Sequence, residues 1–148
     1  MSKMISVPYE TTLHVRDHCM CLTVQRAARA LARMFDEALR PHDLTNGQFS
    51  LLMSLNRPAP PNLSSVASLL AMDRTTLTAA LKPLERRGLV NVMVDPSDKR
   101  SRLLALTQEG LRLLSDVMPV WVSTHGDLEQ VLTPGEQSRL LNDLRKLL

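Results

Sequence analysis

This sequence contains few aromatic residues, few glycines and almost no cysteine. Aromatic residues make up 3% of the 148 positions, which disfavours a surface that binds single-stranded nucleic acid by stacking bases on rings. The 5 glycines form no phosphate-binding loop, and no nucleophile stands in a recognisable motif with a base. We therefore expect a protein that is not an enzyme.

Long apolar segments are absent as well. No run approaches the roughly 18 apolar residues that span a bilayer, and the opening residues, MSKMISVPYE, lack the apolar segment of a secretory signal. We therefore expect a cytoplasmic protein that makes no contact with a membrane.

The 2 cysteines, Cys19 and Cys21, fall within one expected helix. Residues two apart on a helix point to different sides, so we expect no disulfide between them. His14 and His18 lie four residues apart, on a face that the two thiols do not share. Four zinc ligands would need a second segment or subunit, and we expect neither a metal site nor another cofactor.

What is present is the composition of an ordinary soluble domain, with 44% hydrophobic and 22% charged residues. A chain of this length can bury one core, so we expect a single domain, residues 1–148. Apolar periodicity and capping residues predict a mainly α fold with one small β hairpin. The expected helices cover residues 11–39, 45–56, 64–72, 74–87, 108–132 and 134–148.

The helix that follows the expected N-cap Asp73 exposes an unusual set of side chains. Leu77, Leu81 and Leu84 recur at helical spacing and predict a buried seam. Pro83 interrupts the helix, and in an ideal helix it costs about 3 kcal/mol and kinks the axis. Small side chains that form hydrogen bonds, and basic ones, can approach base edges and phosphates in a DNA groove. The outer face opposite the seam consists of Thr75, Thr76, Thr78, Ala79, Lys82 and Arg86.

A β hairpin is expected after this helix. Apolar residues alternate with others over residues 90–94 and again over 102–106, which predicts two strands. The Asp-Pro-Ser-Asp sequence favours a turn over residues 95–100, through local side-chain bonds and the fixed φ of proline. Lys99 and Arg100 would then lie at or beside the tip. A hairpin of this kind beside a helix is a wing.

Positive charge is concentrated in this part of the chain. Residues 74–102 contain seven Lys or Arg and three Asp or Glu, a balance of +4, whereas the whole chain carries +3. Localised positive charge favours a polyanion, because each neutralised phosphate releases condensed counterions. The helix and the hairpin together predict binding to double-stranded DNA. The alternatives are a merely solvated charged face and a winged helix that contacts another protein, although the latter should lack a basic outer face.

Both ends of the chain carry more apolar helix surface than one small domain can bury. The expected helix over residues 11–39 has apolar rows on two sides, and the helices after residue 107 carry apolar stripes of their own. Antiparallel pairing with a second copy of the chain would bury these surfaces. We therefore expect a homodimer.

Four spaced motifs occur in order along the chain. They are Leu44-Thr45 with Gln48-Phe49, D-x-T-T-L-T-x-x-L-x-x-L-E-R-R-G-L-V over residues 73–90, Asp95-Pro96-x-Asp98-Lys99-Arg100, and Leu106-Thr107-x-Glu109-Gly110. With these motifs the chain resembles the MarR family of winged helix-turn-helix regulators along nearly its whole length. The resemblance implies a winged helix-turn-helix DNA-binding region over residues 45–107, flanked by dimerisation helices over 11–40 and 108–148.

The resemblance also implies roles for individual residues on DNA. Arg100 of the wing would enter the minor groove, and Asp98 would orient nearby basic groups. Lys99 and Arg86 would serve phosphates or stay solvated, whereas Pro83 departs from the commonest pattern of the family. The residues implied in the major groove are Arg74, Thr75, Thr76, Thr78, Ala79 and Lys82.

Finally, the resemblance implies a repressor on an inverted-repeat operator with half-sites about one helical turn, roughly 34 Å, apart. A small aromatic or lipophilic effector would release it from DNA. No residue identifies the pocket, although His125 beside Trp121 could line it or be an ordinary core histidine. The alternative trigger is peroxide, because Cys21 falls at the position of the sensing thiol in cysteine-based members. Those sensors hold the thiolate with tyrosine hydroxyls where this chain has Gln25 and Phe35, so a small buried residue in a dimer helix is the competing interpretation of Cys21.

Overall fold

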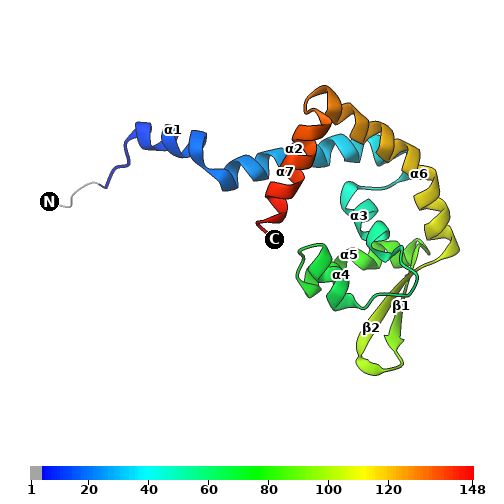
Figure 1. Ribbon diagram of the computed structural model, residues 1–148. Helices are drawn as coiled ribbons and strands as arrows, with labels where there is room; N and C mark the ends of the chain where they lie inside the picture. Colours follow the sequence, from blue (N-terminus) through cyan, green and yellow to red (C-terminus); the bar gives the residue numbers. More distant parts are fainter. Residues whose placement is uncertain (1–4) are drawn as a thin grey trace. The chain divides into compact units, whose positions relative to one another are not determined.

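The computed structural model describes residues 5–148, which are mostly helical with one two-stranded antiparallel sheet (Figure 1). The predicted fold class, mainly α with a small β wing, is confirmed. The contacts within the chain define two compact units, residues 1–34 and residues 35–148. Over the whole described range, no helix combines the length and the apolar character needed to cross a membrane.

The first unit contains helix α1 (Tyr9–His18) and most of helix α2 (Met20–Leu39). The prediction of one continuous helix is wrong, because Cys19 has an extended backbone with φ −77° and ψ 107°. The N–H of Cys19 donates to the Val15 carbonyl at 2.8 Å and closes α1. Its sulfur accepts a hydrogen bond from the Leu22 N–H at 3.4 Å, so the thiol acts as an N-cap of α2.

The second unit begins at the end of α2 and contains all the remaining elements. In chain order these are η1 (Arg40–His42), α3 (Asn46–Leu55), α4 (Leu63–Leu69), α5 (Arg74–Arg86), β1 (Val90–Asp95), β2 (Asp98–Leu106), α6 (Gln108–Asp127), η2 (Leu128–Gln130) and α7 (Pro134–Arg145). The helices after residue 40 therefore appear in the predicted order. The expected N-caps are confirmed as Thr45, Asp73, Thr107 and Thr133.

Several helix boundaries differ from the predictions. Helix α4 ends at Leu69 and α6 ends at Asp127, before the expected residues 72 and 132. Helix α4 begins earlier than expected, because the carboxamide of Asn62 accepts from the Ser65 N–H at 2.8 Å and caps the helix. A serine was the predicted start, since asparagine after a run of prolines gave no helical pattern in the sequence. Helix α7 ends at Arg145, three residues before the predicted end, and leaves Leu147 and Leu148 outside it.

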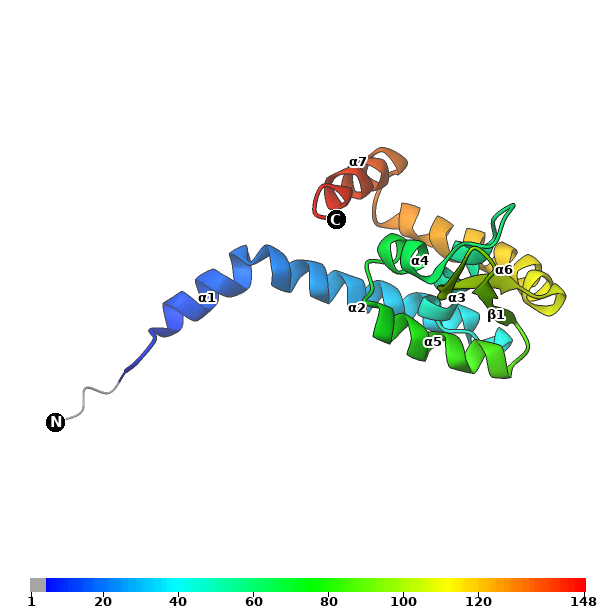
Figure 2. The ribbon, with the colours of Figure 1, turned by 90° about the horizontal axis from the view of Figure 1, so that it is seen from below.

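The core lies where α3, α4, α5, the sheet and α6 meet. Helix α4 contacts both α3 and α5, and α3 also contacts α6. Figure 2 shows α5 along the outside of this group. The predicted seam is confirmed, because Leu77, Leu81 and Leu84 are each no more than 2% exposed. Val117 of α6 is also fully buried. The seam therefore anchors α5 and leaves its opposite face in solvent.

Strands β1 and β2 form the wing, residues 90–106. They pair antiparallel with Val92 opposite Leu104, and the Leu104 N–H also donates to the Pro61 carbonyl at 2.9 Å. The segment before α4 thus joins the base of the wing to the helical core. The predicted six-residue turn is too long, because Asp95 and Asp98 already pair and leave only two residues between them.

A close contact joins the base of the wing to α6. The hydroxyl of Thr107 donates to the Gly88 carbonyl at 2.6 Å and accepts from the Gly110 N–H at 3.1 Å. A Cβ added at Gly110 would lie 2.3 Å from the Leu89 carbonyl oxygen. Only glycine therefore permits this approach of α6 to the backbone that leads into β1.

Candidate nucleic-acid interface

Helix α5 begins at a carboxylate cap. Asp73 Oδ1 accepts a hydrogen bond from the Thr76 backbone N–H at 2.7 Å, and the Thr76 hydroxyl donates to Oδ2 at 2.7 Å. The backbone bond, followed by the hydroxyl bond, lowers the pKa of Asp73 below its ordinary 3.8. The ionised carboxylate stands at the positive end of the helix dipole and fixes the first turn of α5.

The outer face of α5 is fully in solvent. The exposed residues of α5 are Arg74, Thr75, Thr76, Thr78, Ala79, Lys82, Glu85 and Arg86. The Thr78 hydroxyl donates to the Arg74 carbonyl at 2.8 Å, as the Thr76 hydroxyl does to Asp73. Two of these hydroxyls are therefore donors within the protein, and their oxygen lone pairs are left to accept hydrogen bonds. In the major groove, the amino groups of adenine and cytosine are hydrogen-bond donors that these oxygens could accept from.

The C-terminal end of α5 is held by the protein itself. Helix α5 continues through Pro83 to Arg86, although proline supplies no N–H for the Ala79 carbonyl. The Arg87 guanidinium donates to the Asp43 carbonyl at 2.6 Å, and Gly88 has a φ of 70° that ends the helix. Arg87 is therefore engaged in a contact with the turn before α3.

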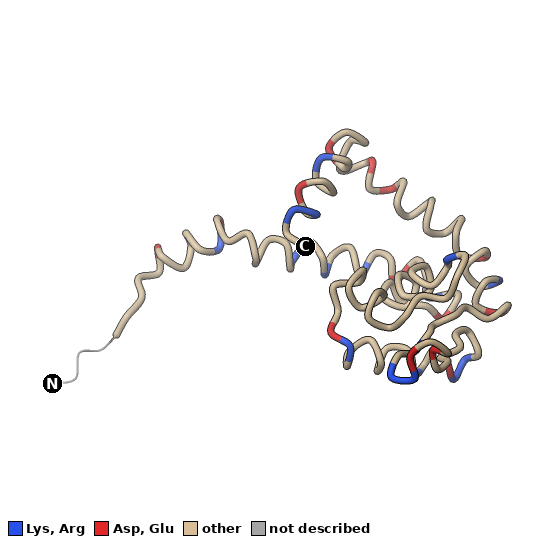
Figure 3. Tube along the Cα trace, turned by 60° about the horizontal axis from the view of Figure 1, so that its bottom comes forward, with Lys and Arg blue, Asp and Glu red and all other residues tan. Residues whose placement is uncertain are grey.

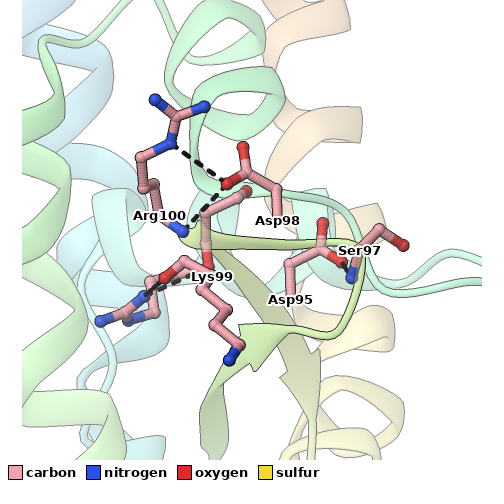
Figure 4. Close-up of polar contacts among 7 residues, drawn as sticks. Asp95, Ser97, Asp98, Lys99 and Arg100 are labelled. Carbon is pink, nitrogen blue, oxygen red and sulfur yellow. Dashed lines mark hydrogen bonds and ion pairs between the residues drawn. The ribbon is translucent and has the colours of Figure 1, made fainter.

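The tip of the wing presents Arg100 to solvent (Figure 4). Asp98 Oδ1 accepts from the Arg100 backbone N–H at 3.0 Å and from its Nε at 3.4 Å. The Arg100 side chain is nevertheless 94% exposed. Asp95 Oδ1 accepts from the Ser97 N–H at 2.8 Å and closes the turn. The two aspartates thus order the backbone of the tip, and the guanidinium group projects beyond it.

Charged residues of both signs lie along α5 and the wing (Figure 3). Lys99 and Arg102 are exposed on β2, and Arg102 Nη1 donates to the Lys99 and Ser101 carbonyls at 3.2 Å each. The basic side chains of α5 and β2 outnumber the acidic ones, and Glu85 is the acidic residue among the exposed residues of α5. An exposed helix with a basic wing beside it suits a duplex, in which a groove is flanked by phosphates.

A cavity of about 400 Å³ lies between α3, α4 and α6. Trp121 lines it, and the His125 ring stacks on the Trp121 ring with centroids 4.8 Å apart without lining the cavity itself. The sequence alone could not identify this cavity, because its lining residues come from three helices that are distant in the chain.

The residues proposed for redox or metal chemistry lie in the first unit. Cys21 is exposed, and the Gln25 carboxamide donates to its sulfur at 3.2 Å. Both cysteines are free thiols. The His14 and His18 rings stack with centroids 4.2 Å apart. In the part of the chain that the structure describes, no three or more His, Cys, Asp or Glu residues are grouped to hold a metal ion.

Known proteins resemble this chain both in sequence and in fold. A sequence model of the MarR family matches residues 44–101. The HTH-type transcriptional regulator TtmR of Methylorubrum extorquens (strain PA1) is 32% identical over 131 residues, which cover 88% of this chain and 66% of TtmR.

Two similar solved structures contain DNA. The M. tuberculosis transcriptional regulator MOSR, in complex with DNA, is 35% identical with a TM-score of 0.79, and the match covers 88% of this chain and 93% of that one. The transcriptional repressor CouR, bound to a 23-mer DNA duplex, is 29% identical with a TM-score of 0.80, and the match covers 90% and 94% of the two chains.

Proposed function

Because this chain belongs to the MarR family of winged-helix transcriptional regulators, we propose that it is a homodimeric repressor that binds an inverted-repeat operator and is released by a small molecule. Its relatives are regulators and not enzymes. The observation that carries the proposal is the exposed, basic and threonine-rich face of α5 beside a wing whose Arg100 is 94% exposed.

In this proposal α5 lies in the major groove and the wing reaches the adjacent minor groove. Thr76 and Thr78 accept hydrogen bonds from base amino groups, and Arg74, Thr75, Ala79 and Lys82 complete the groove surface. Arg86 and Lys99 contact phosphates, and Arg100 enters the minor groove, where negative potential favours a guanidinium group. The solved complexes of MOSR and CouR with DNA support DNA as the partner of this fold.

The proposed homodimer is supported by apolar helix surface that the single chain leaves uncovered. Neither α1 nor α7 contains a buried residue, and Leu140 and Leu141 of α7 are 46% and 45% exposed. A second copy would cover such surfaces, so we assign residues 11–40 and 108–148 to dimerisation and 45–107 to DNA. A two-fold dimer requires an inverted repeat with half-sites roughly 34 Å apart.

Repression and release complete the proposal. A dimer bound near a promoter excludes polymerase, and the naming of CouR as a repressor supports this direction of control. An effector that changes the separation of the two α5 helices prevents both from fitting adjacent grooves, which couples the effector site to DNA. We place that effector in the cavity between α3, α4 and α6.

Oxidation is a second candidate trigger, favoured by one contact. Cys21 is exposed, and the Gln25 carboxamide donates to its sulfur at 3.2 Å. An exposed thiol is accessible to peroxide, which oxidises it to a sulfenic acid. Glutamine thus supplies a donor where the related sensors use tyrosine.

DNA recognition is tested by comparing two variants on a panel of duplexes. The duplexes carry single base changes in the upstream region of the protein's own gene. Thr78→Val removes an acceptor at nearly constant volume, so it should change the ranking of the duplexes by about 1–3 kcal/mol at one position in each half-site. Arg86→Gln should weaken all of them about equally.

A second measurement on the same duplexes tests how many chains bind each one. Sedimentation of the complex should give two chains on each specific duplex. One chain per duplex would contradict the homodimer, and an unchanged ranking with Thr78→Val together with unchanged affinity with Arg86→Gln would contradict the assigned surface.

A further inference from the structure

The cavity between α3, α4 and α6 is lined mainly by large, polarisable side chains. Phe49 and Met53 come from α3, and Met118 and Trp121 from α6. Aromatic rings and methionine sulfur pack favourably against aromatic ligands, and methionine adapts to their shape. A volume of about 400 Å³ lies near the lower end of the usual range for small-molecule sites. The cavity therefore suits a compact molecule of one or two rings.

The polar groups of the lining are two serines. The Ser54 side chain is buried, and its hydroxyl donates to the Leu51 carbonyl at 2.6 Å, so it can only accept from a ligand. Ser50 is exposed, one turn before Ser54 on α3. Among residues 5–148, no Lys, Arg or His lines the cavity, and the imidazole of His125 stacks on the Trp121 ring. The lining thus offers hydroxyl groups to a ligand but no cation.

We propose that this cavity binds an uncharged aromatic or lipophilic molecule and discriminates against organic anions of the same shape. The effect of that molecule on DNA rests on the proposed function. A carboxylate held against this largely apolar lining loses part of its hydration and meets no opposite charge from the lining residues, so its binding is less favourable. A neutral ring loses little hydration and gains contact with Phe49, Met118 and Trp121. The chain therefore selects its effector by charge as well as by size.

Trp121 makes the site directly observable, because it is the single tryptophan of the sequence. The probes are 4-nitrotoluene and 4-nitrobenzoate, which share one shape and differ by the charge of one substituent. Both quench indole fluorescence on contact, and free N-acetyltryptophanamide corrects for absorption and collisions. 4-Nitrotoluene should quench Trp121 saturably and bind at least about tenfold more tightly than 4-nitrobenzoate. Equal or tighter binding of 4-nitrobenzoate, or saturable quenching by neither probe, would overturn the proposal.

A charge introduced at the cavity should reverse this selectivity. Ser50 is exposed on α3, so Ser50→Arg places a guanidinium group at the edge of the cavity without disturbing the core. This variant should bind 4-nitrobenzoate about tenfold more tightly than the parent protein does. The control is Ser115→Arg, which adds the same charge at an exposed position of α6 outside the lining. A folded Ser50→Arg protein with unchanged affinity for 4-nitrobenzoate would contradict the assignment.

Failure of this inference can be distinguished from failure of the proposed function. Trp121 quenching is measured without DNA, and operator affinity is then measured by anisotropy with and without saturating 4-nitrotoluene. Saturable quenching with unchanged DNA affinity supports the ligand class and overturns release by the effector. Tight DNA binding without saturable quenching overturns the ligand class and leaves the repressor proposal standing.

Discussion

Replacing Arg100 by glutamine should weaken operator binding about tenfold to thirtyfold at 0.15 M salt. The Arg100 side chain is 94% exposed, and its Nε lies 3.4 Å from Asp98 Oδ1. Exposed ion pairs of this kind contribute little to folding. The substitution should therefore leave the thermal unfolding midpoint unchanged and act on the complex with DNA alone.

The magnitude follows from counterion release. The proposed dimer presents two copies of Arg100, and each positive charge that displaces a condensed counterion from the duplex contributes about −0.9 to the slope of log K against log salt. Losing both should reduce the slope by about 1.8, which at 0.15 M corresponds to roughly thirtyfold in affinity. The nearby Asp98 carboxylate already offsets part of the Arg100 charge, which lowers the expected loss of affinity toward tenfold.

Anisotropy titrations of an operator duplex at several salt concentrations measure both quantities. The control is Arg112→Gln, an equal change of charge on α6. Arg112 lies beyond the base of the wing, and the nine residues of β2 place that base roughly 25 Å from the tip. If Arg100→Gln leaves the salt slope unchanged, or Arg112→Gln lowers it as much, the wing does not contact DNA as proposed.

Three further predictions concern stability and regulation. Gly110→Ala would put a Cβ 2.3 Å from the Leu89 carbonyl oxygen and should lower the free energy of unfolding by about 2–3 kcal/mol in denaturant titrations. Gly135→Ala is the control, because Gly135 lies in open space, and it should change the free energy of unfolding by less than about 0.5 kcal/mol. Equal losses of stability in the two variants would refute the contact at Gly110. The pKa of Asp36 is lowered below 3.8 by hydrogen bonds from the Asn46 backbone and carboxamide, so its stabilisation is present above pH 3.8 and is lost as the pH falls through the lower folded-state value. Asp36→Asn should flatten the pH dependence of unfolding in that acid range, and an unaltered profile would exclude Asp36 as its source. If Cys21 is the oxidation sensor, Cys21→Ser should keep DNA binding but lose release by peroxide, and peroxide release of the variant would exclude that role.

The helices and their caps were predictable because their signals are local. Thr45 and Asp73 each cap a helix through a backbone N–H three residues away, and the Leu77, Leu81 and Leu84 seam follows from the helical repeat alone. The order of helix, wing and helix could therefore be derived from residues within a few positions of one another.

The features that were not predicted depend on contacts without a sequence signature. The break at Cys19 has neither proline nor glycine, and a thiol is a rare helix cap. The short turn of the wing depends on how far the strands continue to pair, which the turn residues do not determine. The cavity requires α3, α4 and α6 to be packed at a particular separation, so no single segment encodes it.

The cavity and the outer face of α5 are connected by a very short turn, and this decides how a ligand can act. Leu70 lines the cavity, and only Ala71 and Met72 separate it from the cap residue Asp73. Ala71 has a φ of 52°, a conformation that costs an L-residue about 1 kcal/mol or more, and the Met72 N–H donates to the Ala67 carbonyl at 2.9 Å. A turn this short and this firmly held has little freedom to absorb a displacement of α4. A ligand that moves Leu70 must therefore move the start of α5 as well. In the proposed homodimer two such helices have to match adjacent grooves, so a small shift in each is enough to lower the affinity for DNA.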